Sequence, residues 1–151
     1  MKRIFFAVLL LAAPPAFAAP NGAKIFQDQC EFCHQAGGVG VPGQFPRLAG
    51  RAGVIASSPE GRDFLITLLL NGMSGHITAD GQDILGLMPS FATMADGDVA
   101  AVLTYVSRLG KGKAAAFTAK DVADKRGGPS LDPGAVAVQR ANLVTEKIVP
   151  P

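Results

Sequence analysis

The sequence predicts an all-α protein, and three stretches of the chain carry that prediction. In the segment 22–33, small and apolar residues recur at i, i+4, i+8 and i+11, which is one face of a helix. The apolar run F-L-I-T-L-L-L at 64–70 lies between a helix-start and a helix-end signal. From near Asp96 onward, apolar residues recur at i, i+3, i+4 and i+7. The sequence therefore favours helices packed around one core.

The first eighteen residues have the three parts of a secretory signal peptide. Lys2 and Arg3 precede an apolar run at 4–13, and A-F-A at 16–18 is a cleavage site. The run is too short for a membrane span, and an uncleaved anchor is the alternative. We therefore expect an exported, periplasmic protein with no membrane span after cleavage.

Cleavage would also change the charge balance. Without Lys2 and Arg3, the 14 basic residues become 12, which equals the 12 acidic residues. No basic run is interleaved with aromatic residues, so nucleic-acid binding is not expected.

The first expected helix follows the cleavage site. Asn21 is a typical N-cap residue, and Gly22, Phe26, Cys30 and Cys33 form the apolar stripe of the helix behind it. A group attached to the two cysteines would hang from the face that packs into the core.

Both cysteines of the chain and one of its two histidines lie in C-E-F-C-H at 30–34. A dithiol redox site is one interpretation, but the strand–helix alternation of its usual fold is missing. A zinc site needs four ligands, and only His76 remains beyond this segment. The third interpretation is covalent haem, for which C-x-x-C-H is the attachment motif. Cys30 and Cys33 would bond its vinyl groups, and His34 would bind the iron. An incidental motif in an ordinary amphipathic helix is a further alternative.

The sixth position on such an iron is predicted to belong to Met88. A thioether ligand favours reduced iron and raises the potential. Pro89 restricts Met88 to extended geometry, which gives a stiff segment. The glycine-rich segment 71–86 shows no helical period, so we expect a loop that wraps a haem edge and presents the sulfur.

Three other side chains are weaker candidates for this position. Met73 and Met94 are expected to fill gaps in the core, as methionines often do. His76 could bind iron, but it lies in a polar turn and is expected to be solvated.

The rest of the chain adds helices. Ser58-Pro59 is a cap and first-turn pair for the helix that ends at Asn71-Gly72. Beyond Gly110, Thr118 and Asp132-Pro133 are start signals for two short helices. We therefore expect a signal peptide at 1–18, a main domain at 19–110 and a C-terminal extension with short helices at 111–151.

Four segments in order resemble the small class I cytochromes c. They are G-A-K-I-F-Q-D-Q-C-E-F-C-H at 22–34, F-P-R-L-A-G at 45–50, M-P-S-F at 88–91 and D-V-A-A-V-L-T-Y-V at 98–106. The resemblance covers residues from about 20 to 110. It implies a cytochrome c-like helical fold around one covalently bound haem c, with its iron between His34 and Met88.

The same resemblance assigns roles to residues in two of these segments. In P-x-L, it implies that the carbonyl of Pro46 fixes the second nitrogen of His34 and that Leu48 contacts the haem, with a simple turn as the alternative. It also implies that the helix around Tyr105 crosses the first helix near Gly22, where glycine permits close approach.

The expected function is one-electron transfer by an exported carrier that is not itself an enzyme. Its expected partners are redox proteins, with an exported dehydrogenase as donor and an oxidase or another cytochrome as acceptor. The chain's extension weakly resembles those of cytochrome subunits that serve such dehydrogenases. A haem enzyme or gas-binding protein with an open sixth position is the alternative.

Overall fold

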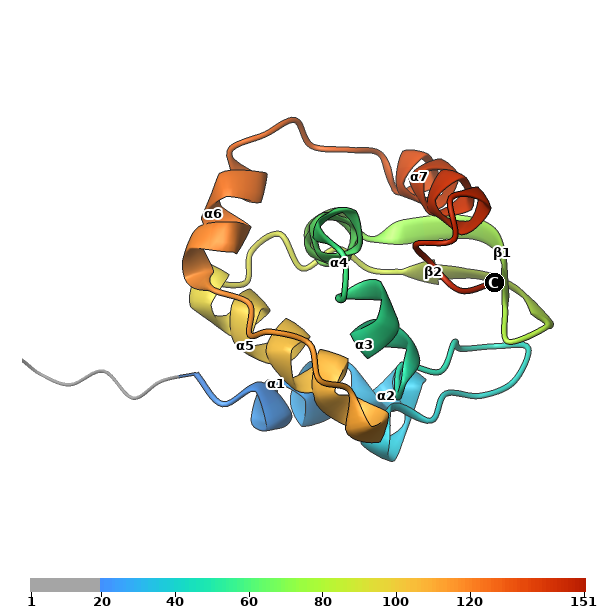
Figure 1. Cartoon of the computed structure of the whole chain (residues 1–151), viewed down its shortest axis with the longest axis horizontal. Coiled ribbons are helices and arrows are strands. Elements are labelled where there is room, and N and C mark those ends of the chain that lie inside the picture. The colour runs from blue at the N-terminus through green and yellow to red at the C-terminus, as the bar shows by residue number, and fades with distance from the viewer. Residues whose placement is uncertain (1–19) are drawn as a thin grey trace, which may run out of the picture.

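The computed structural model describes residues 20–151, so the predicted signal peptide lies outside the described residues. Helices dominate this part of the chain (Figure 1). The elements in chain order are α1 (Gly22–Gln29), α2 (Glu31–His34), η1 (Ala36–Gly38), α3 (Arg51–Ile55), α4 (Pro59–Asn71), β1 (Met73–Ala79), β2 (Gln82–Met88), α5 (Asp96–Arg108), η2 (Leu109–Lys111), α6 (Ala119–Arg126) and α7 (Pro133–Thr145).

The all-α prediction is wrong, because the segment expected to be a glycine-rich loop forms an antiparallel hairpin. Strands β1 and β2 pair from Met73 opposite Met88 to Ala79 opposite Gln82. Asp80 and Gly81 make the two-residue turn, and both have positive φ, as the tight turns of β-hairpins require. The dipeptide Asp-Gly is a hairpin signal in the sequence itself.

The predicted helix starts are confirmed. Asn21 Oδ1 accepts a hydrogen bond from the Lys24 amide at 3.1 Å, and Ser58 Oγ accepts one from the Gly61 amide at 3.0 Å. Thr118 and Asp132 cap α6 and α7 in the same way. These caps satisfy amide groups that the first turn of a helix leaves without partners.

Helices α1 and α5 cross closely, also as predicted. A Cβ atom at Gly22 would lie 2.1 Å from the carbonyl oxygen of Ala101, so only glycine fits there. Next to this point, the rings of Phe26 and Tyr105 pack with their centroids 5.5 Å apart. The crossing holds the C-E-F-C-H segment, which follows α1, against the core.

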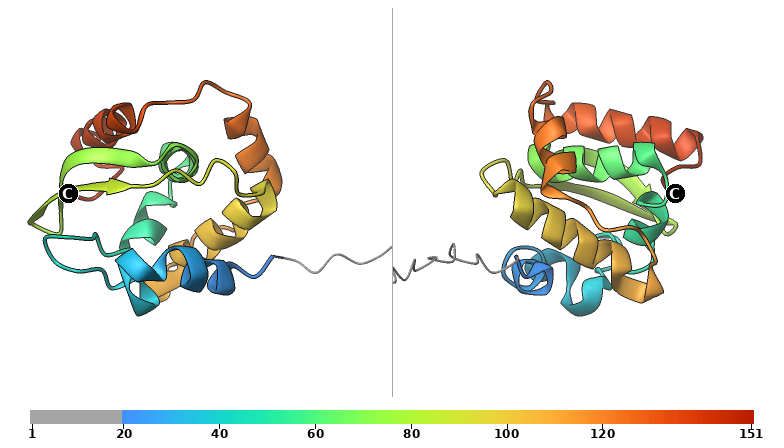
Figure 2. Two further views of the ribbon diagram at one scale, coloured as in Figure 1. Left: turned by 180° about the vertical axis from the view of Figure 1, so that it is seen from behind. Right: turned by 60° about the vertical axis from the view of Figure 1, so that its left-hand side comes forward.

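The buried apolar side chains form two separate clusters. The larger one joins the inner faces of the helices, and it includes Phe117 and Val122 of the C-terminal extension along with Val136 and Val149. The smaller one consists of Ile77, Ala79 and Ile84 on the hairpin. Helix α7 packs on β1 and α4, so the C-terminal segment closes over the hairpin (Figure 2).

We predict that Gly22→Ala destabilises the protein because the new methyl group must push α1 away from α5. Overpacking of this kind lowers the free energy of unfolding by about 1–3 kcal/mol. Urea unfolding of the haem-loaded protein measures the change. Gly97→Ala is the matched control, since a Cβ there meets only Pro20 at 3.5 Å. Equal stability of the two variants would contradict the close crossing.

Candidate functional site

The C-E-F-C-H segment places its three chemical groups in one turn. Cys30 ends α1 and begins α2, and its carbonyl accepts hydrogen bonds from the amides of Cys33 at 3.2 Å and His34 at 2.9 Å. Both cysteines are free thiols of intermediate burial, and they line the same cavity as His34. This turn therefore presents two sulfurs and one imidazole to a single space.

The raised pKa of the Cys30 thiol argues against disulfide-exchange chemistry. Burial raises the pKa of Cys30 to about 11, and the neighbouring Cys33 adds to the rise. A reactive dithiol site needs a lowered thiol pKa instead. A zinc centre finds no support either, because residues 20–151 contain no group of three His, Cys, Asp or Glu side chains that could hold a metal ion.

His34 is buried and held by one hydrogen bond. Its Nδ1 lies 2.9 Å from the carbonyl oxygen of Pro46, so Nδ1–H donates and Nε2 keeps its lone pair. Burial lowers the pKa of His34, and the bond to Pro46 opposes that effect. The imidazole is thus kept neutral with one nitrogen free, which is the form that binds metals.

The loop after His34 explains how Pro46 reaches the imidazole. Gly40 has φ 70°, and a Cβ there would lie 2.6 Å from the carbonyl oxygen of Phe45. The amide of Gly40 donates to the His34 carbonyl at 2.8 Å, and the amide of Leu48 donates to Gly38 at 2.8 Å. These bonds fold the chain back on itself, so that Leu48 lines the cavity beside His34.

The hairpin brings two methionines to the cavity. Met73 and Met88 are opposite each other at its open end, and both line the cavity. The chain after Met88 is tied to the end of α4 by two hydrogen bonds, from Ser90 Oγ to the Leu70 carbonyl at 2.5 Å and from the Phe91 amide to the Leu69 carbonyl at 2.9 Å. The sulfur of Met88 is therefore carried on a segment fixed at both ends.

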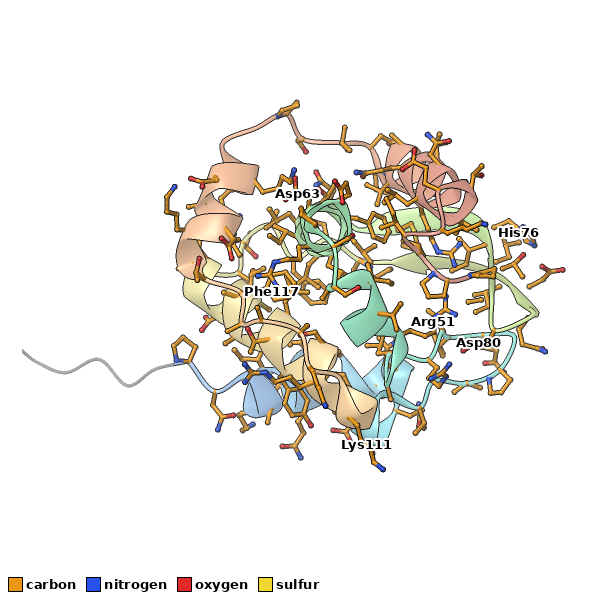
Figure 3. All side chains as sticks on the ribbon, in the orientation of Figure 1. Arg51, Asp63, His76, Asp80, Lys111 and Phe117 are labelled. Atoms are coloured by element: carbon orange, nitrogen blue, oxygen red, sulfur yellow. The ribbon has the colours of Figure 1, made fainter. Side chains whose placement is uncertain are left out.

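The other two candidates lie elsewhere. The side chain of His76 is 60% exposed, with Nε2 3.5 Å from Asp83 (Figure 3). Neither His76 nor Met94 lines the cavity. Of the side chains weighed from the sequence for the sixth position, the structure brings only Met73 and Met88 to the side of the cavity formed by the hairpin.

The cavity itself is apolar and separates the two buried clusters. Its walls come from α3, α4 and α5 of the larger cluster and from Ile77 and Ile84 of the smaller one. Its empty space, including the open mouth, is about 1510 Å³. An apolar group in this space would join both clusters into one core.

Sequence reasoning missed the polar residues and the C-terminal residues of the cavity wall. Arg47, Arg51, Arg140 and Val149 all line it. Arg47 is the variable middle residue of the P-x-L segment and Arg51 follows that segment, so no motif singles out either of them. Arg140 and Val149 reach the cavity only through tertiary packing of α7 and the chain behind it, and no local pattern indicates that.

Comparison with known proteins identifies the family of the chain. Residues 17–106 match the family described as cytochrome C oxidase, cbb3-type, subunit III. A cytochrome c-552 from one strain of Thermus thermophilus is 40% identical over 148 residues, which cover 95% of this chain and 98% of that protein. A second Thermus thermophilus cytochrome c-552 is 40% identical over 128 residues, covering 82% of this chain and 96% of that protein.

The chain belongs to the cytochrome c family. It is an electron-transfer protein with a covalently bound haem c, and it is a carrier, not an enzyme. The predictions of family, cofactor and function are thereby confirmed. The cavity fits the group, since two thiols and a neutral imidazole face an apolar space that divides the core.

We predict that the haem stays with the polypeptide when the protein is denatured in acid and extracted with organic solvent. Thioether bonds to Cys30 and Cys33 resist this treatment, whereas a haem held only by axial ligands leaves. The absorbance of the two phases measures the partition. The double variant Cys30→Ala/Cys33→Ala is the control and should release any haem it retains. Haem in the organic phase from the native protein would refute thioether attachment.

Proposed function

We propose that the chain passes single electrons through a haem whose iron is bound by His34 and Met88. One observation carries this proposal: His34, whose Nδ1 is bonded to Pro46, and Met88, at the end of the hairpin, line the same cavity. The proposed haem-binding set comprises two thioether cysteines, two axial ligands and two supporting residues, namely Cys30, Cys33, His34, Met88, Pro46 and Leu48.

The residues around the haem would keep its redox chemistry simple. When bound, haem iron supplies the one-electron couple, and a thioether ligand favours its reduced form. Pro46 holds His34 in one tautomer and orientation, and the bonds of Ser90 and Phe91 to α4 hold the segment behind Met88. The apolar walls exclude water. Because both ligands stay in place, little has to move when the electron arrives.

Met73 is the second candidate for the sixth position, since it lines the cavity opposite Met88. Two features favour Met88. Pro89 follows it and fixes the local backbone, and the bonds of the next two residues anchor the segment to α4. Met73 instead contacts both apolar clusters, which is the position of a packing residue.

The chain exchanges electrons with redox protein partners, as a cytochrome c does. We propose an exported dehydrogenase as donor and an oxidase or another cytochrome as acceptor, and the description of the matched family supports the oxidase. Residues 20–151 contain no helix long and apolar enough to cross a membrane. The signal-peptide pattern at 1–18 supports export to the periplasm.

We also propose domain boundaries. The match over residues 17–106 supports a cytochrome domain at 19–110, followed by the extension at 111–151. The extension shares the core of that domain, because Phe117, Val122 and Val136 are buried in the larger cluster.

Met88→Ala is predicted to open the sixth position while the haem stays attached. The thioether's preference for reduced iron disappears, so the potential should fall by a fraction of the ~0.8 V range that axial ligands span. Visible absorption spectroscopy should show a change from low-spin to high-spin iron, and carbon monoxide should bind readily. A potentiometric titration measures the fall.

Met73→Ala and His76→Ala are the matched controls, and both should keep the native low-spin spectrum. If Met73→Ala alone opens the site, the ligand is Met73 and not Met88. If the native protein is already high-spin and binds carbon monoxide readily, neither methionine is a stable ligand. That result would favour a haem protein with an open sixth position.

A further inference from the structure

A buried arginine at the cavity wall has no carboxylate partner in the described part of the chain. Arg140, on α7, is 8% exposed and lines the cavity. Its Nη2 donates to the carbonyl oxygen of Thr78 on β1 at 2.7 Å. Within residues 20–151, no Asp or Glu oxygen lies within 4.0 Å of its guanidinium nitrogens. A full positive charge is thus buried against one neutral acceptor.

The nearby charges raise the free-energy cost of burying the Arg140 guanidinium. Arg51 is also buried, and its Nη1 donates to Asp80 Oδ1 at 2.9 Å (Figure 3). Arg47 donates to the same carboxylate at 3.0 Å. Two arginines therefore share Asp80. Burial, and then the positive charge of Arg51, lowers the pKa of Arg140. Asp80 offers Arg140 no ion pair of its own.

A buried charge without a partner costs several kcal/mol, so proteins supply a counter-charge where they bury an arginine. Arg140 is also one of the residues that line the cavity. An anion placed in that cavity would complete the site. A planar guanidinium suits a carboxylate in particular, because two parallel N–H···O bonds can form.

Haem c carries two such groups, the propionate carboxylates on the edge away from its vinyl-derived thioethers. We propose that Arg140 pairs with a haem propionate, and that Arg51 beside it adds a second positive charge to this carboxylate site. The inference rests on the proposed placement of the haem in this cavity. It makes the C-terminal segment a part of the haem site, because α7 supplies Arg140 and the chain behind it supplies Val149.

The pairing has a consequence for the redox potential. A positive charge near the haem favours the state with one more electron, and neutralising a propionate acts in the same direction. In Arg140→Gln, the guanidinium is lost and the propionate keeps its full negative charge. The ratio of reduced to oxidised protein at a fixed ambient potential should fall about tenfold, which is ~59 mV for a one-electron couple.

Two variants separate charge from structure. Arg140→Lys retains the positive charge and should recover more than half of the lost potential. Arg126→Gln is the matched control, because Arg126 also connects the C-terminal segment to the rest of the protein. It donates to Asp96 at 2.7 Å and to the carbonyl of Met94 at 2.7 Å, and it does not line the cavity. In Arg126→Gln, the ratio of reduced to oxidised protein at the same ambient potential should change by less than about twofold.

Potentiometric titration of the three haem-loaded variants tests the proposal, with visible spectra recorded alongside. An unchanged potential in Arg140→Gln, or an equal fall in Arg126→Gln, would overturn it. Should Arg140→Gln fail to mature, a crystal structure of the native haem-loaded protein decides the matter. We expect a guanidinium nitrogen of Arg140 within about 3.2 Å of a propionate oxygen. A propionate that points to solvent away from Arg140 would overturn the pairing.

The proposal that Met88 is the sixth ligand is contradicted by other results than the proposal for Arg140. A high-spin native spectrum removes the axial role of Met88 but leaves the propionate contact and the potential shift testable. A low-spin spectrum with an unshifted potential removes only the role of Arg140. The two outcomes are therefore distinguishable.

Discussion

The apolar cavity between the C-E-F-C-H turn and the hairpin is the constraint on which the rest of the structure depends. It divides the buried side chains into two clusters, and its walls include large residues such as Phe64, Leu65 and Ile84. A fully buried side chain of this size contributes about 1.5–3 kcal/mol, and part of that is lost when it faces a gap. In the proposed placement, the haem fills this cavity and is the centre of the core as well as the redox group. The contacts between the haem and the cavity walls then serve both core packing and electron transfer.

The sequence predicted the features that depend on local signals or a fixed spacing. Asn21 and Ser58 cap their helices, whereas the bond from His34 to Pro46 was implied only by the resemblance to class I cytochromes c. The hairpin was missed for a physical reason. Its second strand carries apolar residues on both faces, since Leu85 is 80% and Leu87 69% exposed while Ile84 is buried. That pattern hides the alternation by which a half-buried strand is recognised.

Long-range packing accounts for the remaining gap between sequence and structure. Arg140 contacts Thr78 across 62 positions of the chain, and Arg51 donates to the carbonyl of Pro150 at 2.7 Å across 99. No periodicity encodes such pairs. They nevertheless bring the C-terminal segment over the hairpin, so the extension lines the cavity proposed for the haem. The observation that supports this proposed role is the burial of Arg140 at the cavity wall, with no carboxylate partner among residues 20–151.

Amide hydrogen exchange tests most directly whether the haem completes the core. It compares the native haem-loaded protein with Cys30→Ser/Cys33→Ser purified free of haem. Without the group between the two clusters, the amides of β1, β2 and α7 should lose most of their protection, because their inner faces border the cavity. In the haem-loaded protein these amides should exchange slowly. Equal protection of the hairpin and α7 in both proteins would contradict the account, since the core would then be complete without haem.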